Sequence, residues 1–187
     1  MHFVTVPGIG GSGKKHWQRI WEAEWGQRAS RISVTSWTSP DLKDWTDAIE
    51  QAVRQAESQS VVLVAHSLGC LAAARWTANR RTDILGVFLV APPDRAGAIF
   101  PAAAPTFAAV AEKPLDVPGL MVFSDNDPYC APDVAARLSN DWAVPAINAG
   151  SLGHINSASG LGRWDGGHAM LTAFSAGLRS ERVQSVR

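Results

Sequence analysis

Cysteine is scarce in this sequence, and the histidines do not form a metal-binding pattern. The chain of 187 residues has two cysteines, Cys70 and Cys130, and no Cys-x-x-Cys pair. A disulfide framework or a thiolate metal site needs more cysteines at closer spacing, so we interpret both as free thiols. The five histidines show no spacing such as His-Glu-x-x-His. We therefore expect no metal site and no cofactor.

Charge and long hydrophobic runs are scarce as well. Charged residues make up 18% of the chain, and the 17 basic residues balance the 17 acidic ones. No basic tract could neutralise a row of phosphates, which argues against a nucleic-acid partner. The absence of a long apolar run and of a secretory signal argues against a membrane association. We expect a cytoplasmic protein, and no feature predicts its oligomeric state.

Hydrophobic residues, in contrast, are abundant and follow two alternating patterns. Short apolar runs rich in β-branched residues predict six strands, at 3–6, 32–34, 61–65, 86–90, 120–123 and 144–147. Apolar residues at three- and four-residue steps predict helices at 17–25, 42–56, 68–78, 132–138 and 170–178. The run at 61–65 is apolar on both faces and therefore needs helices on both sides. These patterns predict one α/β domain over residues 1–187, with a doubly wound, mostly parallel, three-layer sheet of about six strands.

The segment 92–118 interrupts this alternation because it is rich in alanine and proline. It predicts at most a short helix around Phe107 to Ala111. In a doubly wound sheet the ligand site lies beyond the carboxyl ends of the strands, so this segment would overhang that site. Its few large apolar residues include Ile99, Phe100 and Phe107. We therefore expect a small lid or none.

Ser67 lies between a predicted buried strand and a predicted helix, in the sequence Ala-His-Ser-Leu-Gly. The nucleophile elbow of α/β hydrolases has the pattern Gly-x-Ser-x-Gly in this context, with small residues because strand and helix approach closely. Ala65 replaces the first glycine, and Gly69 provides the second. A serine that only caps the helix is the alternative, but it does not require this flanking pattern. We predict Ser67 as a nucleophile.

A serine nucleophile needs a base within hydrogen-bond reach, and in this fold the base follows the acid in the chain. Two histidines follow Ser67, namely His154 in a loop after the last predicted strand and His168 on the last predicted helix. We predict His154 as the general base because a loop at this position can reach back across the sheet. His168 is the weaker candidate.

Two aspartates follow the predicted strand at 120–123 and are candidates for the carboxylate that orients the base. Asp127 directly precedes Pro128, where the loop turns. Asp125 could instead bond its own backbone in an Asx turn. We favour Asp127 and keep Asp125 as the alternative.

The oxyanion of such a reaction needs two backbone N–H donors. One comes from the residue after the nucleophile, here Leu68. The second comes from a loop after an early strand, and the glycine-rich segment 7–13 lets the backbone approach a ligand. We predict Ile9 as the second donor because it follows a Pro-Gly pair.

Several of these motifs together resemble a small serine-hydrolase family that includes YdeN and retinoblastoma-binding protein nine. The resemblance covers nearly the whole chain and rests on Pro7-Gly8, His16-Trp17, Ala65-His66-Ser67-Leu68-Gly69, Ser124-x-x-Asp127-Pro128 and Gly153-His154-Ile155-Asn156. It implies a compact α/β hydrolase without a large lid, with Ser67, Asp127 and His154 as the catalytic residues. The vertebrate member binds a pocket protein through Leu-x-Cys-x-Glu. Ala72 stands at the glutamate position here, so that partner is not implied.

The predicted function is hydrolysis of a small-molecule ester or amide through an acyl-enzyme. Two alternatives remain. The segment 8–14 matches the start of a phosphate-binding P-loop, although Lys15 stands where such a loop needs Ser or Thr. A non-catalytic binding protein on a hydrolase scaffold is the second alternative, since a fold does not determine a function.

Overall fold

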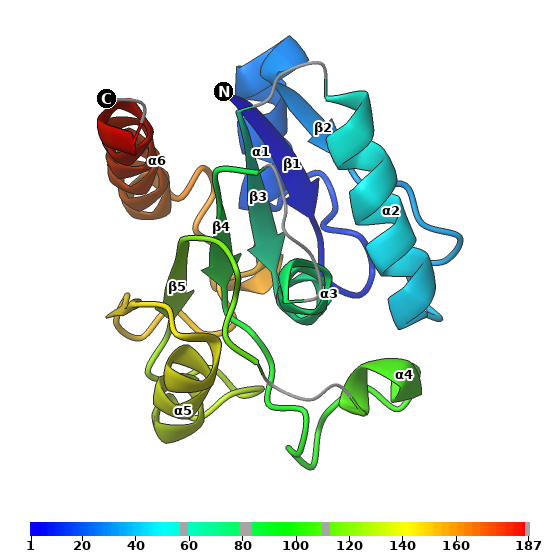
Figure 1. Cartoon of the computed structure of the whole chain (residues 1–187). Helices are drawn as coiled ribbons and strands as arrows, with labels where there is room; N and C mark the ends of the chain where they lie inside the picture. Colours follow the sequence, from blue (N-terminus) through cyan, green and yellow to red (C-terminus); the bar gives the residue numbers. More distant parts are fainter. Residues whose placement is uncertain (57–59, 79–83, 110–112, 186–187) are drawn as a thin grey trace.

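A six-stranded sheet forms the centre of the protein (Figure 1). The computed structural model describes residues 1–56, 60–78, 84–109 and 113–185. The strands are β1 (His2–Val6), β2 (Ala29–Arg31), β3 (Val61–His66), β4 (Gly86–Val90), β5 (Gly119–Phe123) and β6 (Ala146–Asn148). Their order is β2-β1-β3-β4-β5-β6, and every neighbouring pair is parallel. The predicted parallel α/β sheet is confirmed.

Helices cover both faces of the sheet. Helices α2 (Leu42–Gln55), α3 (Leu68–Thr77) and α5 (Pro132–Trp142) contribute to one hydrophobic core, and α1 (Trp17–Trp25) and α6 (Asp165–Ser185) contribute to the other. The central strand β3 serves both cores, because Leu63 and Ala65 pack into the first and Val62 and Val64 into the second. This alternation explains why residues 61–65 of β3 are all apolar.

The tryptophans of α1 form part of the second core, as their four-residue spacing predicts. Trp17, Trp21 and Trp25 are all buried. The ring of Trp21 stacks on that of Trp164, with centroids 5.9 Å apart and planes 4° apart. The indole N–H of Trp17 donates to the carbonyl of Ile155 at 2.8 Å, which connects α1 to a loop after β6. These side chains therefore serve packing and loop anchoring.

Both edge strands differ from the predicted positions. The structure places β2 at Ala29–Arg31, not at 32–34, although Ile32 is buried and its amide still donates to the carbonyl of Thr5. It places β6 at Ala146–Asn148, not at 144–147. Val144 is buried by packing against Gly119, not by strand pairing. In both regions the most apolar residues face the core from a loop next to the strand.

The described part of the segment 92–118 contains one short helix, α4 (Pro105–Ala108), close to the predicted position. The predicted range extended to Ala111, of which 110–112 lie outside the described residues. Phe107 is fully buried, and its ring meets that of Trp45 with centroids 5.2 Å apart. Phe100 packs against the same core. Phe100 and Phe107 therefore both face the core.

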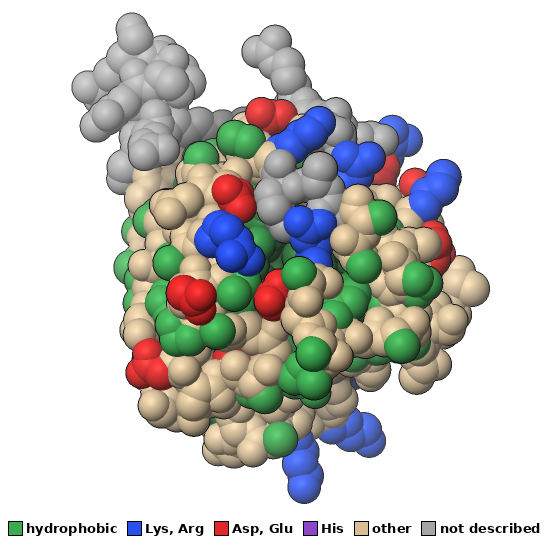
Figure 2. Space-filling model, turned by 90° about the horizontal axis from the view of Figure 1, so that it is seen from below, with side chains coloured by type: hydrophobic (Ala, Val, Ile, Leu, Met, Phe, Trp, Pro, Cys, Tyr) green, Lys and Arg blue, Asp and Glu red, His purple; other side chains and the backbone are tan. Residues whose placement is uncertain are grey.

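Figure 2 shows the end of the molecule toward which the strands point. Basic and acidic side chains are interspersed among hydrophobic ones there, without a continuous patch of one sign. Among the described residues, no helix combines the length and the apolar character that crossing a membrane requires.

Candidate active site

Ser67 lies in a sharp turn between β3 and α3 with a strained backbone. Its φ of 53° and ψ of −126° are unusual for a residue other than glycine. The turn is held by a hydrogen bond from Ser67 N to the carbonyl of Val90 on β4, at 2.9 Å. A Cβ on Gly69 would lie 2.2 Å from the carbonyl oxygen of Val6, so no side chain fits at this position. The close contact between α3 and β1 is therefore the reason why the elbow pattern has a small residue at this position.

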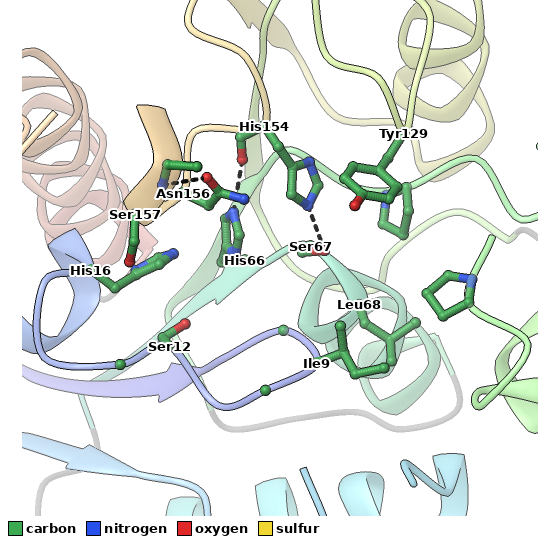
Figure 3. A pocket seen from close by; sticks show the side chains of 16 residues that line it. Ile9, Ser12, His16, His66, Ser67, Leu68, Tyr129, His154, Asn156 and Ser157 are labelled. Atoms are coloured by element: carbon green, nitrogen blue, oxygen red, sulfur yellow. Dashed lines mark hydrogen bonds between the residues drawn. The ribbon is translucent and has the colours of Figure 1, made fainter. Parts of the chain in front are cut away.

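Three side chains from separate parts of the chain meet at this turn. His154 Nε2 is 2.8 Å from Ser67 Oγ (Figure 3). On its other side, His154 Nδ1 is 3.0 and 2.9 Å from the two carboxylate oxygens of Asp127. All three residues are buried. A carboxylate only accepts, so Nδ1 carries a proton and Nε2 of the neutral ring can accept the hydroxyl proton of Ser67.

The two weaker candidates lie elsewhere. Asp125 is exposed and accepts a hydrogen bond from the side chain of Asn148. The Asx turn expected for Asp125 is made by Asp127 instead, since Tyr129 N donates to Asp127 Oδ1 at 2.9 Å. His168 lies on α6 with its ring against Trp21, at a centroid distance of 5.3 Å. It lies in a groove between α1 and α6, not in the cavity beside Ser67.

A cavity of about 390 Å³ opens beside Ser67. Its lining includes both residues predicted as oxyanion donors, Ile9 and Leu68. Leu68 is the first residue of α3, so its amide has no partner one turn earlier in the helix. Within the described residues no hydrogen bond engages the amide of Ile9, whereas Gly10 N donates to Trp37 O. The loop passes directly beside Ser67, because a Cβ on Gly8 would lie 2.8 Å from Ser67 Cβ.

No formally charged side chain lines this cavity in the described part of the chain. The lining residues are Gly8, Ile9, Gly10, Ser12, Gly13, His16, His66, Ser67, Leu68, Pro93, Pro101, Tyr129, His154, Asn156, Ser157 and Ala158. Burial lowers the pKa of His16 to about 4, and the nearby positive charge of Arg31 contributes. Burial also holds the pKa of His66 well below its usual range, with His16 as the next cause. Both rings are therefore neutral near pH 7.

The two cysteines are free and buried, as the sequence predicts. Burial raises the pKa of the Cys130 thiol to about 12, and the carboxylate of Asp127 adds to the effect. Burial raises the pKa of Cys70 as well. Neither sulfur is a thiolate at neutral pH, so neither competes with Ser67 as a nucleophile. The described residues contain no cluster of His, Cys, Asp and Glu that could hold a metal ion.

Comparison with known families identifies the chain. The sequence profile described as serine hydrolase matches residues 3–173. This chain belongs to that serine hydrolase family. A YdeN-like hydrolase from Pectobacterium atrosepticum is 32% identical, with a TM-score of 0.84 over 95% of this chain and 91% of that one. The YdeN protein of B. subtilis is 18% identical, with a TM-score of 0.78 over 94% and 98% of the two chains. The resemblance read from the motifs is thereby confirmed.

More distant structures share the fold of this serine hydrolase. Est1E from Butyrivibrio proteoclasticus, in a structure with ferulic acid bound, is 12% identical with a TM-score of 0.68, and the match covers 91% of this chain and 88% of that chain. A comparison with curated proteins gives no match.

The backbone amides of the P-loop-like segment 8–14 bear on the nucleotide-binding alternative. Two of its amides, Gly10 N and Gly11 N, already bond carbonyls of the protein, so they do not form an open phosphate cradle.

Sequence reasoning missed three polar side chains around the site. His66 Nε2 bonds the carbonyl of His154 at 3.0 Å. Asn126 Oδ1 accepts from the amide of Gly153 at 2.7 Å. His16 caps α1, because its Nδ1 accepts from Gln18 N at 3.2 Å. A signal was present for each of them, since His66 and Asn126 directly precede Ser67 and Asp127 in the chain and His16 belongs to the His16-Trp17 motif.

Proposed function

We propose that this protein hydrolyses small, uncharged esters or amides through an acyl-enzyme on Ser67. His154 acts as the general base, and Asp127 orients it. The observation that carries the proposal is the continuous hydrogen-bonded line from Ser67 Oγ through both ring nitrogens of His154 to Asp127. In unrelated folds this constellation, recognised by its geometry, performs the same acyl transfer.

The reaction proceeds in two halves. Ser67 Oγ attacks the carbonyl carbon of the substrate while His154 Nε2 takes the hydroxyl proton. The amides of Leu68 and Ile9 stabilise the negative oxygen of the tetrahedral intermediate, and the N-terminus of α3 favours that charge further. His154 then returns the proton to the leaving alcohol or amine, which leaves the acyl group on Ser67. Water then attacks the acyl carbon while His154 takes a proton from it, and His154 passes this proton to Ser67 Oγ as the acid is released.

The cavity supports small and uncharged substrates. A volume of about 390 Å³ is near the lower end of the range of ligand pockets, about 300–1,000 Å³. No charged side chain of the described residues lines it, so a carboxylate or an ammonium group on the substrate would find no counter-ion there. The segment 92–118 contributes Pro93 and Pro101 to the lining, whereas Phe107 faces the core. This arrangement does not provide a long apolar channel for an acyl chain.

Labelling with a fluorophosphonate probe tests the nucleophile, because such probes react only with an activated serine. We expect the native protein to be labelled and Ser67→Ala to be neither labelled nor active, with its thermal unfolding unchanged within a few degrees. Labelling of Ser67→Ala at the native rate would refute the assignment. A native protein that folds but is not labelled would favour the non-catalytic binding scaffold instead.

A panel of p-nitrophenyl esters, thioesters and anilides tests the substrate class. The structural neighbours include an esterase domain from Rhodothermus marinus and the type II thioesterase BorB, so both bond types belong in the panel. We expect acetyl and butyryl groups to be the best acyl groups. A succinyl ester, which adds a carboxylate to an acyl chain of similar length, should react at least about tenfold more slowly, because the charge is desolvated without a partner.

A further inference from the structure

The loop that carries His154 has a backbone with little regular support. Gly150 and Gly153 have φ values of 81° and 60°, and Ile155 has a φ of 48°, a region in which a β-branched residue is strained. A loop of this kind holds one conformation only if its surroundings impose it. The position of the His154 ring relative to Ser67 therefore depends on contacts outside the loop.

Side chains from three other elements supply those contacts. Each of them bonds a backbone group of the loop. Ser124 Oγ accepts from Leu152 N at 2.8 Å, and Asn126 Oδ1 accepts from Gly153 N at 2.7 Å. Trp17 Nε1 donates to Ile155 O at 2.8 Å, and His66 Nε2 bonds His154 O at 3.0 Å. Of these four bonds, the one from His66 acts on a backbone atom of His154 itself. His66 is therefore the anchor closest to the reacting ring.

The chemistry of this bond defines the state of the His66 ring. A carbonyl oxygen can only accept, so His66 Nε2 carries the proton and donates it. The ring is buried, and it packs between the rings of His16 and His154, at centroid distances of 4.6 and 5.1 Å. Burial and these neighbours keep the pKa of His66 far below 7, so the donor is a neutral imidazole.

The hydrogen bond between His66 Nε2 and His154 O adds a second connection between the segment of the proposed base and that of the proposed nucleophile. His66 and Ser67 are consecutive residues, and His154 contacts both of them, through its carbonyl oxygen and through its Nε2 (Figure 3). The backbone of His66 belongs to β3, which is paired on both sides within the sheet. The main chain and the ring of His154 are thus both held relative to one rigid strand end.

We propose that His66 is a positioning residue, whose Nε2–H holds the main chain of His154 so that its ring meets Ser67. This role rests on the proposed function, because it concerns the placement of the proposed base. Misplacement of a reacting group by about 1 Å lowers a rate by up to about 10²-fold. A residue that only fills space would affect folding without a specific effect on turnover.

A pair of variants of similar shape separates these roles. His66→Gln keeps an N–H donor at about the distance of Nε2, and His66→Met has a similar length without a donor. We expect His66→Met to lower kcat for p-nitrophenyl acetate about 10- to 100-fold, with KM within threefold of the native value. His66→Gln should retain kcat within about fivefold. If His66→Met does not fold, His66→Asn replaces it, since its amide is one methylene too short to reach the carbonyl.

Two further measurements exclude a general loosening of the loop. Trp17→Phe removes the neighbouring hydrogen-bond donor to Ile155 O. It should lower kcat less than threefold, even where its loss of thermal stability is similar to that of His66→Met. In proton NMR spectra, the downfield signal of His154 Nδ1–H bound to Asp127 should be present in the native protein and His66→Gln, and broadened in His66→Met.

Equal loss of kcat in His66→Gln and His66→Met would overturn the proposal, as would native kcat in His66→Met or an equal loss in Trp17→Phe. The two proposals fail in different ways. If the native protein is neither labelled by a fluorophosphonate nor active on any ester, thioester or anilide, the proposed function is wrong. If the native protein is active and the His66 variants behave alike, only the role of His66 is wrong.

Discussion

Replacing Asp127 by asparagine tests the proposed base with a change that conserves shape. Asp127 Oδ1 accepts from Tyr129 N, and an asparagine needs its own oxygen at that position to keep the bond. The NH₂ group then faces His154 Nδ1 and donates to it. His154 must accept at Nδ1, which moves its proton to Nε2. In that tautomer Nε2 cannot take the proton of Ser67.

The expected loss of kcat is large for this reason. The same change in the chymotrypsin-type triad lowers kcat about 10⁴-fold, which corresponds to about 5 kcal/mol of transition-state stabilisation. Asp125→Asn is the matched control, since Asp125 is exposed and its asparagine keeps an acceptor for Asn148. Asp125 bonds Asn148 instead of His154, and most surface substitutions change stability by about 0.5 kcal/mol or less, so kcat should stay within about fivefold.

Stopped or continuous assays with p-nitrophenyl acetate measure both variants, and the rate of fluorophosphonate labelling gives an independent reading. Thermal unfolding should show both variants folded. The reasoning is refuted if Asp127→Asn keeps kcat within tenfold of the native value. A larger loss in Asp125→Asn than in Asp127→Asn would transfer the orienting role to Asp125.

Three other results are expected. First, kcat/KM should fall from butyryl to palmitoyl p-nitrophenyl esters and should not jump when the substrate forms micelles, because Phe107 packs into the core; a steady rise with chain length would reveal an apolar channel. Second, Gly69→Ala should destabilise the protein by more than about 2 kcal/mol in urea unfolding, because its Cβ would meet the carbonyl of Val6; Gly177→Ala, with open space around the Cβ on a helix, should stabilise it by about 0.5–1 kcal/mol. Third, stability should fall as pH drops from 6.5 toward 4. Unfolded His16 takes up a proton near pH 6.5 and the folded protein only near pH 4, so the unfolded state binds more protons in this window. The free energy of unfolding should fall by about 3 kcal/mol over this pH window. His16→Asn keeps a capping oxygen for α1, and its free energy of unfolding should depend less steeply on pH. An unchanged slope would contradict this prediction.

The sequence by itself determined the alternation of strands and helices and the segments of chain that form the proposed active site. A strand covered on both faces must be apolar throughout, so β3 was readable from its residues alone. The elbow around Ser67 was readable for a related reason, because the contact of α3 with β1 excludes any side chain at Gly69. Parallel strands end at one edge of the sheet, which places the loops after β3, β5 and β6 together.

The edge strands could not be placed as well from sequence. Their bounds depend on backbone pairing with one neighbour, whereas the apolar pattern records side-chain burial. Ile32 and Val144 are buried but lie outside the strands. Pro145 has no N–H to pair, although its carbonyl accepts from Met121 N, so regular pairing of β6 begins only at Ala146.

Only the tertiary structure decided the relations between residues that are distant in the chain. Asp127 and Asp125 both follow β5, and the difference between them is that one carboxylate reaches His154 and the other Asn148. The bond of His66 to the His154 carbonyl spans 88 positions in sequence. The neutral state of the His66 ring likewise results from burial by surrounding elements. Such contacts depend on the packing of the whole sheet and its helices, which brings residues distant in the chain within hydrogen-bond reach.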